Sequence, residues 1–197
     1  MQNYLFFIIF IFICYLLGST PTSIITGRII KGIDIRDHGS GNAGGTNVFR
    51  ILGWKPGLFV IIIDILKGWI PVAILAPKFY LFGPISDLGV VQIISGFAAV
   101  LGHTYTIFAK FKGGKGVGTL GGMMIALFPT VFPFCLLIAI ITLIMTGYVS
   151  LASIIASCSL PILLLVIPPF LNVYPAPLSI MIFLSLIHIS EPTRPIH

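Results

Sequence analysis

The chain has 197 residues, of which 57% are hydrophobic and only 8% are charged, and its mean hydropathy is +1.13. A soluble domain of this composition could not hydrate its surface, so the sequence predicts an all-α, polytopic membrane protein and excludes a soluble globular one. The net charge of +6 comes from 11 Lys and Arg against 5 Asp and Glu. Three cysteines in apolar segments, without motif spacing, predict neither a disulfide framework nor a metal site.

The first predicted span covers residues 4–25, about 20 residues that match the ~30 Å hydrocarbon core of a bilayer. Gly18, Ser19 and Pro21 predict a kink near its end. Five cations follow in the next loop: Arg28, Lys31, Arg36, Arg50 and Lys55. The positive-inside rule places this loop in the cytoplasm and the N-terminus outside.

Within that loop, residues 36–50 read RDHGSGNAGGTNVFR, with glycines interleaved among hydroxyl and amide side chains. Such a backbone can turn its N–H groups toward an anion, and the two flanking arginines suit a phosphate. A plain connector beside a membrane span is the alternative. Residues 46–53 predict a short amphipathic helix that Thr46 caps and Gly53 closes, with four apolar side chains at the membrane interface: Val48, Phe49, Ile51 and Leu52.

The second predicted span, residues 57–76, carries Asp64 and Lys67 on one helical face. Charges at that depth face the protein interior, either as a structural ion pair or as ligand contacts. An outer loop at 77–87 leads to the third predicted span, 88–109, which brings His103 to the side of the first loop.

A second basic loop follows at 110–116, with the sequence KFKGGKG. Its glycines and lysines predict a further part of an anion site, with inside-positive anchoring as the alternative. The loop is not a nucleotide P-loop, because Ala109 stands where the first glycine is required and Gly116 where a hydroxyl is required.

Residues 117–145 form an apolar run of about 29 residues that Pro129 and Pro133 interrupt. Two short spans that turn near residues 128–133 fit a bilayer better than one helix of ~43 Å. With two spans, Ser150 arrives on the side of the basic loops, and with one span it faces outside. A sixth span is predicted at 151–168 and a seventh at 175–189.

Four motifs together resemble the PlsY family of bacterial membrane acyl-phosphate:glycerol-3-phosphate acyltransferases: GSGNAGGTNVFR at 39–50, DILKG at 64–68, GHTYTIFAKFKGGKG at 102–116 and YVSLAS at 148–153. The resemblance implies seven spans, cytoplasmic motif loops and a single acyltransferase domain over 1–189. It also implies transfer of an acyl group from acyl phosphate to glycerol 3-phosphate, without a cofactor or metal.

By the same resemblance, the expected catalytic residues are Ser40, His103, Lys115 and Ser150. The expected phosphate-binding residues are Gly41, Thr46, Asn47, Arg50, Lys112, Gly113 and Gly114, with backbone amides of the last two available to a phosphate or an oxyanion. The general base stays open between His103, whose ordinary pKa is about 6.5, and a substrate phosphate.

The expected partners are the two phosphorylated substrates, membrane lipids and, transiently, the soluble enzyme that makes acyl phosphate, with no nucleic acid. The expected location is the bacterial inner membrane. Two departures from the family pattern are Thr106 in a proline position and the end of the chain, where residues 190–197 look like a non-native tail in place of a family segment. A small anion transporter or channel is the rival function, because charges within a span and kinked helices also suit an anion pathway.

Overall fold

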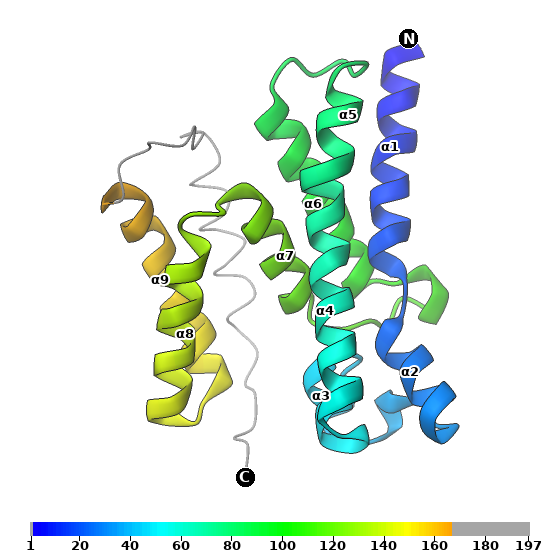
Figure 1. Cartoon of the computed structure of the whole chain (residues 1–197). Coiled ribbons are helices and arrows are strands. Elements are labelled where there is room, and N and C mark those ends of the chain that lie inside the picture. Colours follow the sequence, from blue (N-terminus) through cyan, green and yellow to red (C-terminus); the bar gives the residue numbers. More distant parts are fainter. Residues whose placement is uncertain (1, 167–197) are drawn as a thin grey trace. The chain divides into compact units, whose positions relative to one another are not determined.

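The structure, a computed structural model, describes residues 2–166. Within that range it has nine α-helices and no β-strand, which confirms the all-helical prediction (Figure 1). The chain divides into two compact units, the first ending at Leu127 and the second beginning at Phe128. The predicted seventh span at 175–189 and the predicted tail at 190–197 lie outside the described residues.

The first unit begins with a broken helix. Helix α1 spans Gln2–Ser19, and after a break at Thr20 and Pro21 the chain continues as α2, Thr22–Lys31. Proline lacks an N–H group and disfavours a helical residue before it, so the straight helix ends there. The predicted kink is confirmed, although the apolar stretch runs six residues further than 4–25.

Helix α3, Gly45–Leu52, follows the glycine-rich loop. Its N-cap residue is Gly44, without a side-chain cap, so the prediction that Thr46 caps the helix was wrong by two positions. Gly53 ends it as predicted, with a positive φ of 94°. Val48, predicted to face the membrane interface, is instead buried in a core cluster with Ile35 and Val60, whereas Phe49 is exposed.

The second apolar stretch consists of α4, Trp54–Ile70, a π-helical turn at Pro71–Leu75 and α5, Ala76–Tyr80. The third begins at α6, Leu88–Thr104, where the Asp87 carboxylate accepts hydrogen bonds from the Gly89 and Val90 N–H groups. Among the described residues, three stretches can cross a membrane by length and composition: Tyr4–Lys31, Trp54–Tyr80 and Leu88–Ala109. They correspond to the first three predicted spans.

Helix α7, Val117–Leu127, completes the first unit. It has 11 residues and is about 16 Å long, shorter than a bilayer core. The helices pack as α1 on α6, α3 on α4 and α4 on α7 (Figure 1). Glycines permit two of these contacts. A Cβ atom on Gly18 would lie 2.0 Å from the Ala99 carbonyl oxygen, and a Cβ atom on Gly68 would lie 1.8 Å from the Thr119 carbonyl oxygen.

The second unit contains α8, Phe132–Thr146, and α9, Val149–Val166. Gly147, with a φ of 72°, ends α8. The interruption between α7 and α8 confirms the predicted break near residues 128–133. Helix α9 corresponds to the predicted sixth span and carries Ser150 in its first turn.

Candidate active site

The two polar loops meet in the first unit. The Arg36 Nη1 atom donates hydrogen bonds to the carbonyl oxygens of Ala109 (3.0 Å) and Lys112 (3.2 Å). Gly114 lies so close to the first loop that a Cβ atom there would be 2.8 Å from the Ala43 carbonyl oxygen. Segments far apart in the sequence therefore form one polar region.

Asn47 organises the glycine-rich loop from the first turn of α3. Its Nδ2 atom donates to the carbonyl oxygens of Ile35 (2.9 Å) and His38 (3.0 Å), and its Oδ1 atom accepts from the Ser40 N–H (3.0 Å). Asn47 is 1% exposed, and both the oxygen and the nitrogen of its side-chain amide are hydrogen-bonded within the loop. Asn47 thus holds the loop in shape, and its predicted contact with phosphate stays a prediction.

A buried charged cluster lies behind the loops. The Lys67 Nζ atom is 2.7 Å from Asp64 Oδ1, and His103 Nδ1 is 3.6 Å from the same oxygen. All three residues are less than 10% exposed. The sequence left open whether Asp64 and Lys67 form a structural ion pair or contact a ligand, and the geometry shows the ion pair. His103 from α6 joins this pair.

The cluster also reaches the break between α1 and α2. Lys67 Nζ donates to the Thr20 carbonyl oxygen (2.6 Å), and the Thr106 hydroxyl donates to that of Ser19. Carbonyls at a helix end have no intrahelical partner, so these two donors satisfy groups that the break exposes. The charged pair and the kink, which the sequence suggested separately, form one arrangement.

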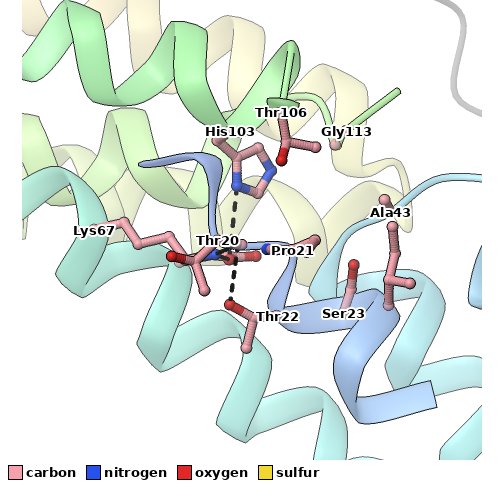
Figure 2. Close-up of a pocket in the computed structure, with 12 residues that line it drawn as sticks. Thr20, Pro21, Thr22, Ser23, Ala43, Lys67, His103, Thr106 and Gly113 are labelled. Atoms are coloured by element: carbon pink, nitrogen blue, oxygen red, sulfur yellow. Dashed lines mark hydrogen bonds and ion pairs between the residues drawn. The ribbon is translucent and has the colours of Figure 1, made fainter. Parts of the chain in front are cut away.

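A small cavity of about 10 Å³ lies among these groups. It is lined by residues of the break at 20–24, by Asp64, Lys67 and His103, and by Gly113 and Gly114. Figure 2 shows His103, Thr106 and Gly113 on one side of the cavity, across from Ser23 and Ala43. This volume holds about one water molecule, so the cavity is too small for a phosphate group.

The glycines of the second loop serve close packing. The Gly113 N–H donates to the Thr104 carbonyl oxygen (3.0 Å) and the Gly114 N–H to that of His103 (3.2 Å). A Cβ atom on Gly113 would lie 1.9 Å from the His103 carbonyl oxygen, and one on Gly114 2.3 Å from His103 Nε2. Both amides are therefore already hydrogen-bonded within the protein, and their predicted contact with a phosphate or an oxyanion stays a prediction.

The other predicted residues divide by exposure. Five are exposed on the two loops and α3: Ser40, Gly41, Thr46, Arg50 and Lys112. Lys115 is half-buried in the second loop. Ser150 lies in the second unit, so the predicted meeting of Ser150 with Ser40, Arg50 and Lys115 stays a prediction.

Sequence reasoning did not assign the break at residues 20–24 to the site. The available signal was a run of hydroxyl residues beside a proline at the end of a span, with charges at similar depth in the next span. Because charges within a membrane seek polar partners, such a run is a candidate partner.

An all-helical unit with long apolar stretches and a polar region rich in Lys and Arg at the helix ends is typical of an integral membrane protein that acts on anionic molecules. The family model described as glycerol-3-phosphate acyltransferase matches residues 8–196. The chain belongs to this family, as the resemblance indicated.

Individual relatives agree. The chain is 48% identical to a glycerol-3-phosphate acyltransferase of Chlorobium phaeobacteroides (strain BS1), over 81% of the chain and 69% of the relative. It is 47% identical to a glycerol-3-phosphate acyltransferase of Chlorobaculum parvum, over 80% of the chain and 70% of the relative.

Among solved structures, it resembles the glycerol 3-phosphate form of PlsY (YgiH), an integral membrane glycerol 3-phosphate acyltransferase, with a TM-score of 0.75, 38% identity and coverage of 93% of this chain and 86% of that one. The lysophosphatidic acid form gives a TM-score of 0.76 and 37% identity, with coverage of 93% of this chain and 85% of that one. These likenesses support an acyltransferase and not the rival anion transporter.

Proposed function

We propose that the chain transfers a fatty acyl group from acyl phosphate to a hydroxyl of glycerol 3-phosphate, the first acylation in phospholipid biosynthesis. The hydroxyl oxygen attacks the carbonyl carbon of acyl phosphate, the bond between that carbon and the phosphate oxygen breaks, and the hydroxyl proton moves to a base. The products are 1-acyl-glycerol 3-phosphate, or lysophosphatidate, and inorganic phosphate. Acyl phosphate is an activated anhydride, so the residues mainly orient substrates and stabilise charge.

The observation that carries the proposal is the joining of the two basic, glycine-containing loops above a buried His103 in a member of this family. Two phosphorylated substrates require several cations and donors at one place. Arg50 and Lys112 are exposed and Lys115 is half-buried, so they are our candidates for phosphate contacts, with Gly41 and Thr46 beside them.

Ser40 and Ser150 are our candidates for hydrogen bonds to a phosphate or to the carbonyl oxyanion. Ser40 is exposed on a backbone that Asn47 fixes, so its hydroxyl can face a substrate. Ser150 would contribute from the first turn of α9.

The position of His103 bears on the general base. His103 is 8% exposed, its Nδ1 atom is directed at Asp64 and its Nε2 atom lies against Gly114. A base must lie within hydrogen-bond reach of the proton that it removes. The burial of His103 therefore favours a substrate phosphate oxygen as the proton acceptor, with His103 supporting the second loop.

The proposed location is the bacterial inner membrane, with the site facing the cytoplasm. Eight of the 11 Lys and Arg residues belong to the two loops or their edges, which the positive-inside rule places inside. A soluble enzyme that makes acyl phosphate could then deliver its product at the same face. Within this proposal, residues 1–189 form one acyltransferase domain and 190–197 a tail.

The test uses the purified chain in lipid, supplied with acyl phosphate and glycerol 3-phosphate. Release of phosphate together with lysophosphatidate is expected, and Lys115→Ala and Arg50→Ala should each abolish both. Lys55→Ala is the matched control, because Lys55 is an exposed cation near the same loop that lies over the Trp54 ring, and it should keep wild-type activity. Phosphate release without lysophosphatidate would contradict the proposal.

A further inference from the structure

The second basic loop opens with an unusual turn. Lys110 and Phe111 have φ values of 57° and 58°, and they are the non-glycine residues with positive φ in the described part of the chain. Side chains with a Cβ atom rarely adopt this left-handed conformation, because Cβ approaches the backbone carbonyl. Two such residues in succession persist only where surrounding contacts hold them.

Arg36 supplies those contacts from the first loop. Its Nη1 atom donates to the carbonyl oxygens of Ala109 and Lys112, the two residues that flank the left-handed pair. Within the turn, the Phe111 N–H donates to the Thr106 carbonyl oxygen (2.9 Å). One guanidinium thus closes the turn by bridging its two ends.

Asp34 fixes the orientation of that guanidinium. Its Oδ1 atom accepts from Arg36 Nε (3.0 Å) and its Oδ2 atom from Arg36 Nη2 (2.7 Å), the two-pronged geometry of a strong charge-assisted pair. The hydrogen bond from Arg36 lowers the pKa of Asp34 to about 2, so the pair is ionised at neutral pH. Nε and both Nη atoms of Arg36 therefore each donate to protein oxygens, which leaves Arg36 poorly suited to bind a phosphate.

We propose that Asp34 and Arg36 form a clamp that holds the left-handed turn at Lys110 and Phe111, so that the lysines after the turn point at the substrate phosphate. Arg36 is then a positioning residue, and only the identity of the substrate rests on the proposed function. Lysine cannot replace it, because an ammonium group lacks the planar fork that binds Asp34 and two carbonyls together.

The first test measures amide hydrogen exchange of the peptide covering residues 104–116 in the substrate-free protein. Arg36→Lys should speed the exchange of this peptide at least tenfold, and Asp34→Asn should also speed it. Arg28→Lys is the matched control, because Arg28 lies 3.9 Å from the same carboxylate, is 68% exposed and contacts neither carbonyl. Equal exchange in the Arg36→Lys and Arg28→Lys proteins would overturn the clamp, whether or not the wild-type chain transfers acyl groups.

The second test asks whether Arg36 acts through the turn. Arg36→Lys should raise KM for at least one phosphorylated substrate about tenfold, with a smaller change in kcat. Glycine adopts the left-handed conformation without strain, so adding Phe111→Gly should recover at least threefold of that loss. Phe108→Gly is the matched control, since Phe108 is exposed in the same segment but has no positive φ. No recovery with Phe111→Gly, or equal recovery with both, would overturn the positioning role.

Discussion

The buried pair of Lys67 and Asp64 gives the sharpest prediction for stability. The Lys67 Nζ and Asp64 Oδ1 atoms are 2.7 Å apart and both side chains are at most 6% exposed, so neither charge can be fully hydrated when its partner is removed. Lys67→Met leaves the Asp64 carboxylate without its cation, which should lower the free energy of unfolding by about 3–5 kcal/mol. The Thr20 carbonyl oxygen still accepts from the Thr22 N–H (2.9 Å), so losing the lysine there matters less.

A double-mutant cycle isolates the pair. Asp64→Asn should also destabilise, because it leaves the buried ammonium without a counterion, although the amide oxygen can still accept a hydrogen bond. If the two losses were independent, the double variant would lose their sum, about 6–10 kcal/mol at most. Because the double variant contains no unpaired charge, we expect it to lose no more than the worse single variant.

The assay is reversible denaturation of the purified variants in mild detergent, with acyl transfer measured on the same samples. A coupling energy below about 1 kcal/mol, or a double variant that loses the full sum, would refute the reasoning that the pair is desolvated and mutually dependent. The stability of the double variant also separates folding from function, since a folded but inactive double variant would show that the charges also serve the site.

Three further predictions concern the loops. Gly114→Ala should lower kcat/KM at least tenfold by displacing His103, whereas Gly44→Ala, whose Cβ would meet only a flexible amide side chain, should have little effect in the same phosphate-release assay. Asn47→Ala leaves buried loop groups unpaired and should cost about 1–3 kcal/mol of unfolding free energy, measured by denaturation. Because its pairing with Arg36 lowers the pKa of Asp34 to about 2, ionised Asp34 stabilises the fold above about pH 4, and this stability should be lost as pH falls toward 2. The free energy of unfolding, measured as a function of pH, should lose this pH dependence in the Arg36→Gln variant.

The sequence predicted the helical class, the first three of the seven expected spans and both interruptions, because these depend on local properties. Apolar length places a span, and Pro21 and Pro129 lie at the two breaks, where proline cannot continue the helical hydrogen bonding. The two basic loops were also recognisable, since each gathers several glycines and cations into one short stretch.

The direction of individual side chains could not be predicted in the same way. Asn47 and Thr46 are neighbours of similar polarity, yet Asn47 is buried in the loop and Thr46 is exposed. Successive residues of a helix point about 100° apart, so which of two neighbours faces the loop depends on how α3 packs. The approach of His103 to Asp64 depends on how α6 and α4 pack, which no local pattern encodes.

The close backbone contacts of Gly18 and Gly68 determine which substitutions this membrane protein can tolerate. Replacing an exposed residue such as Leu58 by alanine removes bulk at the surface of α4, whereas adding one methyl group to Gly68 forces α4 and α7 apart. Both changes conserve apolar character. Variation among natural sequences or engineered libraries should therefore be judged along these helices by side-chain volume, and a hydrophobicity score alone would rank a damaging variant as harmless.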